Sequence, residues 1–282
     1  MLLDARNFVK ERIEELKERA NNLYKKPKLV IIKVGYDKAS EKYVNNKVKR
    51  CKEVGIGSFI IQLGNYSSNE DVARIIDECN RDINITGILL QLPLPEHLDE
   101  NYLTQLIEPK KDVDGFTELN MGKLMIGNKQ NIACTPKGIM KLLDYYKIEL
   151  EGKDVLIVNR SNIVGKPLAL MMMERNATVT IAHSKTKNLK NKVKSADVVV
   201  LGVGIRDFVG APHFKDGATI IDVSINFDEN GKLCGDVCKK DYNRLLEKNC
   251  NITPVPNGIG QMTVMALIEQ TIKIQERNQN LR

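Results

Sequence analysis

The chain has 282 residues, of which 42% are hydrophobic and 28% charged, and its formal net charge is +7. This composition is typical of a soluble globular protein with one large domain or two ordinary ones. No apolar run approaches the roughly 18 residues that cross a bilayer, and no patch mixes basic and aromatic residues as nucleic-acid grooves do.

The cysteines and the N-terminal residues indicate where the chain works. No Cys-x-x-Cys pair occurs, and Cys234 and Cys238 have neither a second pair nor a nearby histidine. We therefore expect reduced thiols and no metal site. Residues 1–6 lack the basic-then-apolar order of a secretory signal, so we expect a cytoplasmic protein. The positive charge suits either a solvated lysine-rich surface or attraction of an anionic ligand.

The first half of the chain alternates helix and strand. Helical spacing of apolar residues ends before Pro27, and short apolar runs beyond it predict buried strands. In chain order we predict a helix over 2–25, a strand over 29–32, a helix over 39–54, a strand over 59–63, a helix over 69–80 and a strand over 87–90. This order predicts a parallel sheet whose ligands bind beyond the carboxyl ends of its strands.

The second half repeats this alternation. We predict a strand over 153–158, a loop over 159–167, a helix over 168–174, strands over 177–182, 196–201 and 218–223, and a closing helix over 262–282. The predicted fold class is therefore α/β, with two domains that each hold a mostly parallel sheet flanked by helices, the second Rossmann-like. The first domain is assigned to 1–138 plus the C-terminal helix 262–282, and the dinucleotide-binding domain to 139–261.

Three polar residues of the predicted helix 39–54 share one stripe. Ser40, Tyr43 and Lys47 stand at i, i+3 and i+7, beside apolar positions that face the core. Lys47 is then at the inward edge of its helix, where loss of water lowers its affinity for a proton and makes it a useful proton carrier. The alternative is an ordinary solvated lysine in a lysine-rich helix.

Polar residues also follow the strand 87–90. Gln91 stands at its end, where its amide can bond both a lysine and a substrate amide, or else only loop carbonyls. Further on, one carboxylate of Asp112-Val113-Asp114-Gly115-Phe116 can accept paired donors from a heteroaromatic ring. Two aspartates at i and i+2 before glycine also suit an ordinary turn.

The loop 159–167 links a strand to a helix, so its amides can face a phosphate. The Gly-x-Gly-x-x-Gly fingerprint is absent and only Gly165 remains. The next strand ends in Ala182-His183-Ser184-Lys185 and lacks the acid that holds the ribose 2′-hydroxyl of NAD. With Arg160, Ser184 and Lys185 available, this ending favours NADP. His183 is read as a packed or solvent-facing histidine rather than a catalytic one.

These segments occur in the same order as in bifunctional methylenetetrahydrofolate dehydrogenase/methenyltetrahydrofolate cyclohydrolases, which the chain resembles over nearly its whole length. The first three motifs in combination are highly specific. The matching motifs are Ser40-x-x-Tyr43-x-x-x-Lys47, Gln91-Leu-Pro-Leu-Pro95, Asp112-Val-Asp-Gly-Phe116, Thr135-Pro136-x-Gly138, Arg160-Ser161-x-x-Val164-Gly165-x-Pro167, Thr253-Pro254-Val255-Pro256 and Met262-Thr263.

The resemblance implies two linked reactions. Oxidation of 5,10-methylenetetrahydrofolate with NADP forms 5,10-methenyltetrahydrofolate, and water opens that cation to 10-formyltetrahydrofolate. It implies that Lys47 transfers protons with the help of Gln91. It also implies that Tyr43 packs on the folate, that Asp114 binds the pterin edge and that Ser40 supports the lysine–tyrosine stripe.

On the cofactor side the resemblance implies contacts to NADP, with NAD as the alternative. The implied cofactor-binding residues are Asn159, Arg160, Ser161, Gly165, Ser184 and Ile225, of which Arg160 and Ser184 would hold the 2′-phosphate. The expected partners are tetrahydrofolate derivatives, with or without a polyglutamate tail, and a second copy in a homodimer. No nucleic acid and no membrane are expected.

Five departures from the family pattern fall in the cofactor half. The family usually has glycine or proline at these positions, which are Asn159, Arg206, Ser224, Asn257 and Gln261. Side chains in place of glycine can narrow or reshape a nucleotide pocket. The alternative function is therefore a cyclohydrolase whose dehydrogenase activity is weakened or lost. The rival classes are a quinate/shikimate-type or amino-acid dehydrogenase and a non-catalytic nucleotide or folate binder.

Overall fold

The computed structural model describes residues 1–36 and 38–280, except for the side chains of 38–40 and 42. It divides the chain into two compact units. The catalytic unit, as we call it, comprises Lys10–Cys134 and Val264–Arg282, and the nucleotide unit comprises Met1–Val9 and Thr135–Thr263. The first nine residues thus group with the nucleotide unit, whereas the sequence assigned them to the first domain. The reason is a parallel pairing in which Leu3 N donates to Ile252 O at 2.8 Å.

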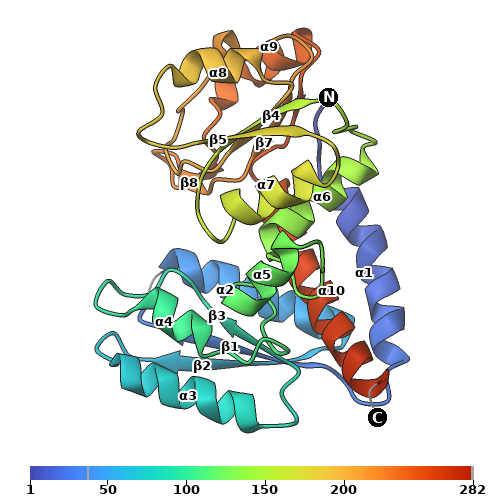
Figure 1. Cartoon of the computed structure of the whole chain (residues 1–282), viewed down its shortest axis with the longest axis vertical. Helices are drawn as coiled ribbons and strands as arrows, with labels where there is room; N and C mark the ends of the chain where they lie inside the picture. Colours follow the sequence, from blue (N-terminus) through green and yellow to red (C-terminus); the bar gives the residue numbers. More distant parts are fainter. Residues whose placement is uncertain (37, 281–282) are drawn as a thin grey trace. The chain divides into compact units, whose positions relative to one another are not determined.

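The catalytic unit is built on a parallel sheet of order β2-β1-β3 (Figure 1). Its strands are β1 (Lys28–Val34), β2 (Gly57–Leu63) and β3 (Gly87–Leu90). Figure 1 shows α2 and α3 on opposite sides of this sheet. The helices that lie wholly or partly in this unit are α1 (Arg6–Asn21), α2 (Lys38–Val54), α3 (Asn69–Arg81), α4 (Glu100–Gln105), α5 (Glu118–Met125) and α10 (Ile259–Asn280).

Alternation along β1 decides which of its side chains face α3 and α4 and which face the opposite side of the sheet. Val30, Ile32 and Val34 pack with α3 and α4 in one apolar cluster. Because successive strand residues point to opposite faces, the residues between them face the other side. Gln91 N donates to Ile32 O at 2.9 Å, so the residue after β3 stays in register at the carboxyl end of the sheet.

The nucleotide unit holds a five-stranded parallel sheet of order β10-β7-β6-β4-β5 and a short antiparallel hairpin, β8–β9. The strands are β4 (Asp154–Val158), β5 (Thr178–Ala182), β6 (Val198–Leu201), β7 (Thr219–Asp222), β8 (Asn226–Phe227), β9 (Leu233–Cys234) and β10 (Asn251–Ile252). The chain leaves β4 for β5 on one side and returns to β6 on the other. The topological switch point, where such sheets bind nucleotides, therefore lies between β4 and β6.

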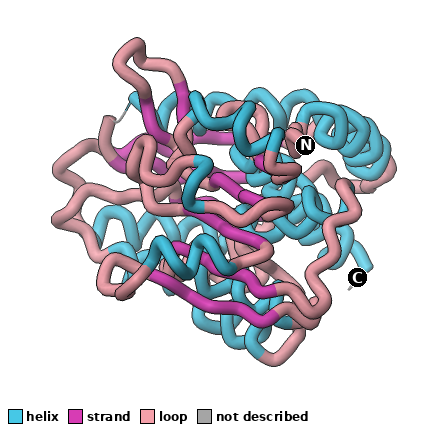
Figure 2. The backbone as a smooth tube through the Cα atoms, turned by 90° about the horizontal axis from the view of Figure 1, so that it is seen from above, coloured by secondary structure: helices cyan, strands magenta, loops and turns pink. Residues whose placement is uncertain are grey.

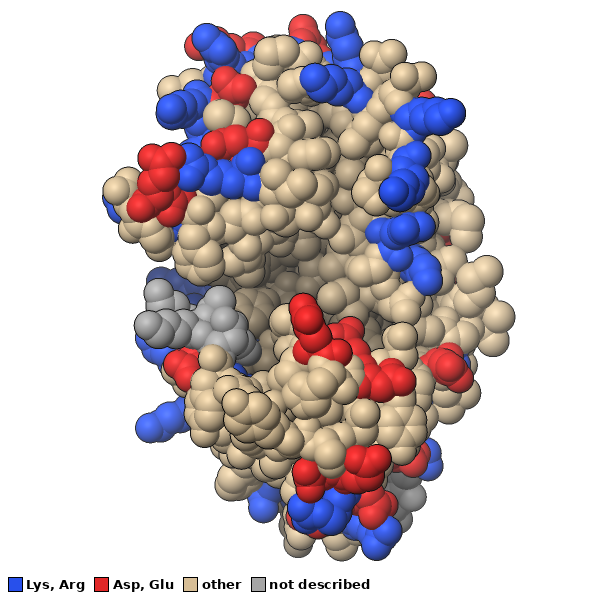
Figure 3. Space-filling view, turned by 90° about the vertical axis from the view of Figure 1, so that its left-hand side faces the viewer, with Lys and Arg blue, Asp and Glu red and all other residues tan. Residues whose placement is uncertain are grey.

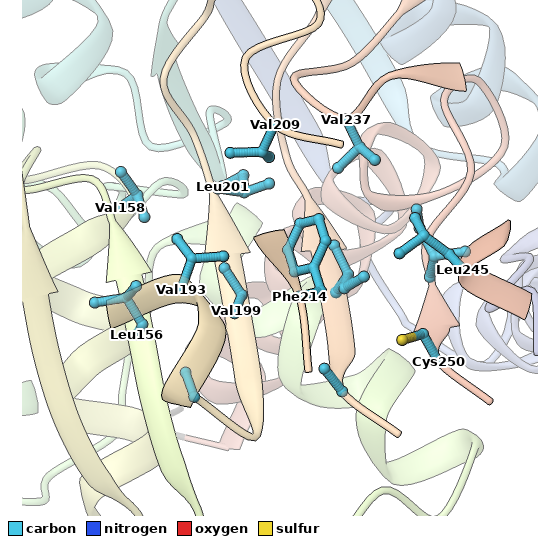
Figure 4. Packing of buried hydrophobic residues seen from close by; sticks show 14 of the residues in the cluster. Leu156, Val158, Val193, Val199, Leu201, Val209, Phe214, Val237, Leu245 and Cys250 are labelled. Carbon is cyan, nitrogen blue, oxygen red and sulfur yellow. The ribbon is translucent and has the colours of Figure 1, made fainter. Parts of the chain in front are cut away.

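Helices and an apolar core support this sheet. The helices of the nucleotide unit are α6 (Cys134–Tyr145), α7 (Gly165–Met173), α8 (Leu189–Ser195) and α9 (Tyr242–Glu247), with short 3₁₀ turns at Ala211–His213 and Lys239–Asp241. Figure 4 shows Leu156 and Val158 of β4, Val199 and Leu201 of β6, and Phe214 converging in the core. Figure 2 traces the loops that leave the strand ends.

The predicted strands and the long helices are present, with some boundaries shifted. Helix α1 covers 6–21 rather than 2–25, because residues 2 and 3 pair with β10 instead. Helix α7 begins at Gly165 rather than at 168, since Pro167 is tolerated in a first helical turn, where backbone N–H groups need no helical partner. The short helices α4, α5, α8 and α9 and the longer α6 were not predicted. Among residues 1–36 and 38–280, no helix has the length and apolar character of a membrane span.

Lys111 closes the C-terminal end of α3. Its Nζ donates to the carbonyl oxygens of Cys79, Asn80 and Asp82 at 3.0, 2.7 and 2.7 Å, so it pairs with the negative end of the helix dipole. Replacing Lys111 with methionine should lower the free energy of unfolding by about 2 kcal/mol, as calorimetry would detect. Methionine at the exposed Lys110 is the control, and equal stability of the two variants would contradict the capping role.

Candidate active site

Lys47 lies buried on the inner side of α2. Its side chain is only 5% exposed. Its Nζ donates to Gln91 Oε1 at 2.8 Å and lies 4.8 Å from the centre of the Tyr43 ring, a cation–π contact. The stripe that the sequence predicted thus brings Tyr43 and Lys47 together with Gln91. Ser40 belongs to α2 by its backbone, and its side chain lies outside the described residues.

The surroundings of Lys47 favour its neutral amine. Burial lowers the pKa of Lys47, and the nearby Asp114 carboxyl opposes this shift. Burial also raises the pKa of Cys51, one helical turn away, to about 12, so this thiol stays neutral and does not hold the lysine charged. A buried lysine with a lowered pKa is suited to accept and return a proton near neutral pH.

Gln91 is oriented from both ends of its amide. Nε2 donates to Leu92 O at 2.7 Å, and Oε1 accepts from Lys47. The oxygen is therefore assigned to the lysine side by the hydrogen bonds themselves. Of the two interpretations that the sequence left open, contact with a lysine and contact with a loop carbonyl are both present.

The two carboxylates of the 112–116 turn are used differently. Asp112 is buried and accepts from Gly115 N, Thr117 N and Asn120 Nδ2 at 2.8 to 2.9 Å, so it holds the turn together. Asp114 is half-buried, and desolvation raises its pKa while Lys47 opposes the rise. The turn thus has one structural aspartate and one whose charge interacts with that of the lysine.

The same turn requires glycine at position 115. Gly115 has φ +68°, and a Cβ there would lie 2.8 Å from Asn131 O. Both the left-handed backbone and the close approach exclude other residues. Cys134 joins the site, with its thiol in hydrogen-bonding reach of Asp114 and 3.3 Å from Val113 O. The sequence analysis missed Cys134, although it directly precedes the Thr135-Pro136 motif.

In the nucleotide unit, the loop between β4 and α7 is organised by Asn159. Its Oδ1 accepts from Ser161 N, Ser161 Oγ and Gly165 N at 2.7 to 3.1 Å, and its Nδ2 donates to Gly202 O at 2.7 Å. Gly165 has no room for a side chain, because a Cβ would lie 2.1 Å from Asn159 O. Of the other predicted cofactor residues, Arg160, Ser184 and Ile225 are exposed.

The residues after β5 are basic. The segment 185–194 has lysine at positions 185, 187, 190, 192 and 194. Lys187 and Lys192 line an open hollow of about 670 Å³. Figure 3 shows lysine and arginine side chains along one edge of the upper part of the molecule, which carries the five-stranded sheet. The lysines of segment 185–194, and the absence of an aspartate or glutamate directly after Ala182, suit the binding of an anionic group at the end of β5.

Two buried aspartates of the nucleotide unit were also missed by the sequence analysis. Asp222, at the end of β7, accepts from Val237 N at 2.8 Å and from Ser224 N at 3.2 Å. Asp236 is fully buried and accepts from Val203 N, Ile205 N, Ser224 Oγ and Asn226 Nδ2. Buried carboxylates with several donors are expected to fix loop shape.

Asp222 should make stability depend on pH. Burial raises its pKa from 3.8 to about 7, against the backbone N–H of Val237, which lowers it. The folded state therefore holds the proton more tightly, and this contribution is complete below pH 4 and lost as pH rises toward 7. We expect the melting temperature to fall between pH 4 and 7 more steeply for the wild type than for Asp222→Asn. Parallel curves in calorimetry would rule out this titration.

Comparison with known families decides what this arrangement is. The model described as "Tetrahydrofolate dehydrogenase/cyclohydrolase, catalytic domain" matches residues 3–114, and the "Tetrahydrofolate dehydrogenase/cyclohydrolase, NAD(P)-binding domain" matches residues 133–279. The chain belongs to the tetrahydrofolate dehydrogenase/cyclohydrolase family. Lys47, Gln91 and the 112–114 turn all lie within the matched catalytic domain of this family.

Individual family members match over nearly their full length. The "Bifunctional protein FolD" of Agathobacter rectalis is 42% identical over 98% of this chain and 99% of the relative, and that of Lachnoclostridium phytofermentans is 45% identical over 96% of each. The crystal structure of the bifunctional FolD enzyme from Campylobacter jejuni has a TM-score of 0.94 at 39% identity, covering 99% of both chains.

Two further structures bear on the cofactor and on the rival class. The Trypanosoma brucei methylenetetrahydrofolate dehydrogenase-cyclohydrolase, complexed with NADP cofactor and inhibitor, has a TM-score of 0.92 at 32% identity, covering 99% of this chain and 98% of that one. A shikimate dehydrogenase from Aquifex aeolicus reaches only 0.51 at 14% identity, over 89% of this chain and 97% of that one, and so shares the fold alone. Membership of the tetrahydrofolate dehydrogenase/cyclohydrolase family therefore displaces the shikimate-type alternative.

Proposed function

We propose that the chain catalyses both reactions of its family. It oxidises 5,10-methylenetetrahydrofolate to 5,10-methenyltetrahydrofolate with NADP and hydrolyses the product to 10-formyltetrahydrofolate. The observation that carries the proposal is the buried Lys47 amine, hydrogen-bonded to Gln91 and favoured in its neutral form. Its relatives with this bifunctional name match it along nearly the whole chain, so we assign both activities rather than hydrolysis alone.

Hydrolysis requires a proton to move twice. Water adds to the methenyl carbon between N5 and N10, and the neutral Lys47 amine accepts the proton that the water loses. Lys47 then returns a proton to N5 as the bond between N5 and this carbon breaks, which leaves the formyl group on N10. The hydroxyl group left on this carbon loses its own proton as it becomes the formyl oxygen, so one proton is released overall. Gln91 accepts a hydrogen bond from Lys47 throughout and keeps the amine aimed at the reacting carbon.

The remaining residues of the catalytic unit hold the folate. The half-buried Asp114 carboxyl would bind the N–H groups of the pterin edge, since a carboxylate accepts two parallel donors. The methenyl substrate is a cation, which favours ionised Asp114. Tyr43, half-buried beside Lys47, offers its ring face to the aromatic part of the folate.

The nucleotide unit fits NADP. The loop 159–165 stands at the switch point, where sheets of this kind bind dinucleotides, and Gly165 packs closely against Asn159 O at the start of α7. Arg160, Ser184 and Lys185 are exposed and supply charge and a hydroxyl for a 2′-phosphate. When bound, NADP accepts the hydride that leaves the methylene carbon. Ile225, 49% exposed, offers an apolar surface for the cofactor.

We extend the proposal to the setting of the enzyme. The six cysteines carry no disulfide in the structure, which fits the reducing cytoplasm. A basic chain of net charge +7 suits folates with an anionic polyglutamate tail. We expect a homodimer, as is usual for the family, and sedimentation at micromolar concentration would test it.

A paired absorbance assay tests the function. One arm follows loss of methenyltetrahydrofolate without cofactor, and the other follows reduction of NADP, and separately of NAD, by methylenetetrahydrofolate. We expect turnover in both arms and faster reduction of NADP than of NAD. Hydrolysis without reduction would identify a cyclohydrolase that lacks dehydrogenase activity, and no turnover in either arm would contradict the assignment of Lys47.

A further inference from the structure

The loop after β6, residues 202–205, is held mainly by side chains from elsewhere in the nucleotide unit, besides one backbone bond from Gly202 N to Val158 O at 3.4 Å. Val203 packs against the apolar core while Gly204 and Ile205 are exposed, so packing alone does not fix the loop. Instead, each of its four residues makes one backbone hydrogen bond to a distant side chain. These bonds are Gly202 O with Asn159 Nδ2 at 2.7 Å, Val203 N with Asp236 Oδ2 at 2.7 Å, Gly204 N with Ser224 Oγ at 3.1 Å, and Ile205 N with Asp236 Oδ1 at 2.9 Å.

Asp236 is the rigid centre of this arrangement. Its carboxylate accepts four hydrogen bonds, two from the loop and one each from Ser224 Oγ at 2.7 Å and Asn226 Nδ2 at 3.1 Å. Its backbone is anchored as well, because Val209 N donates to Asp236 O and Val209 pairs with Val237. Figure 4 shows Val209 and Val237 beside Leu201, the last residue of β6.

Asn159 and Ser224 connect Asp236 and the 202–205 loop to the loop 159–165 between β4 and α7. Ser224 both accepts from Gly204 N and donates to Asp236, so its hydroxyl bridges them. Asn159 reaches Gly202 from the other side, while its Oδ1 gathers Ser161 and Gly165 of the loop that opens α7. The two loops that flank the switch point are thereby tied to each other. Both connections need a side chain, and glycine at either position would provide none.

We propose that Asn159, Ser224 and Asp236 form a clamp that holds the 202–205 loop in its cofactor-binding shape before NADP arrives. The proposal rests on the proposed function, since it assumes that NADP binds at this switch point. They are positioning residues, because they act through the loop rather than on the reacting atoms. A preformed loop lowers the ordering cost of binding, so loss of the clamp weakens cofactor affinity without touching the folate site.

The test uses Asn159→Ala and Ser224→Ala in the full chain. Alanine keeps Cβ, so each variant loses only the polar atoms of the clamp. Hydrogen exchange without cofactor should show faster exchange of the Gly204 amide in Ser224→Ala, and calorimetry should show NADP bound about fivefold more weakly by each variant. The KM for NADP should rise with kcat nearly unchanged, and hydrolysis of methenyltetrahydrofolate should stay at the wild-type rate. Asn230→Ala, at an exposed position of the turn between β8 and β9, should match the wild type.

The outcomes separate this inference from the proposed function. A wild-type protein that does not bind NADP would contradict the function itself. Wild-type binding with unchanged affinity in both alanine variants would overturn the clamp, whether or not exchange changed. If Ser224→Ala fails to fold, as loss of its hydrolysis would show, Ser224→Thr keeps the hydroxyl and should restore both exchange protection and affinity. A folded Ser224→Thr variant that regains neither exchange protection nor NADP affinity would also overturn the clamp.

Discussion

Replacing Lys47 with methionine should lower the rate of methenyltetrahydrofolate hydrolysis about 10³-fold. Methionine keeps the length and apolar contacts of the lysine but cannot carry a proton. Burial lowers the pKa of Lys47 and so favours the neutral amine, and the hydrogen bond to Gln91 orients it. The measurement is absorbance loss of the methenyl substrate at saturating concentration, with circular dichroism to establish that the variant is folded.

A second lysine variant provides the control for the Lys47 experiment. Lys49 lies two residues further along α2 and is exposed, so Lys49→Met changes the same charge on the same helix. We expect it to hydrolyse the substrate at nearly the wild-type rate. A Lys47→Met protein with wild-type turnover would exclude proton transfer by this residue and with it the mechanism proposed above.

The pH dependence of hydrolysis should report the same lysine. A neutral amine is required, so the rate should rise with pH through the pKa of Lys47, which burial places below 10.5. Gln91→Glu would put a carboxylate beside Nζ, which favours the charged lysine and shifts the rise to higher pH. An unshifted profile in Gln91→Glu would show that another group controls the rate.

The pairing of Tyr43 with Lys47 on α2 was predictable because its signal is local. Tyr43 and Lys47 stand one helical turn apart, and the spacing alone places them on one stripe beside the buried Val44 and Cys51. The position of Gln91 followed equally from the short apolar strand before it. In both cases, helix and strand periodicity determine which way the side chain points, and that is enough to form the pair.

The clamp in the nucleotide unit was not predictable in the same way. Asp236 binds residues 31 and 33 positions before it in the chain. No local period relates an aspartate in a loop to two amides that distant, because the contact depends on the tertiary arrangement of the strands that carry the loops. Asn159 was singled out as a departure from the family, yet its sequence position does not reveal that its amide would fill the space inside the loop.

The two aspartates of the 112–116 turn show where sequence reasoning stops. At i and i+2 before glycine, either residue suits a turn and either suits a ligand. The structure separates them through three donors: Gly115 N, Thr117 N and Asn120 Nδ2 all point to Asp112. Asp114 accepts from none of these donors, and its charge interacts with that of Lys47. Substitution of Asp112 should therefore lower stability, and substitution of Asp114 should lower activity.

Asp114→Asn should lower kcat/KM roughly 50-fold for both folate substrates, with the melting temperature nearly unchanged. The amide matches only one of the two donors on a pterin edge, and both reactions use the same edge. Asp112→Asn should instead reduce the free energy of unfolding by about 3 kcal/mol, because one of its oxygens no longer accepts from the turn. Kinetics and calorimetry on both variants test the assignment. The reverse pattern, a destabilised Asp114→Asn and a stable but inactive Asp112→Asn, would mean that Asp112 is the residue that binds the substrate.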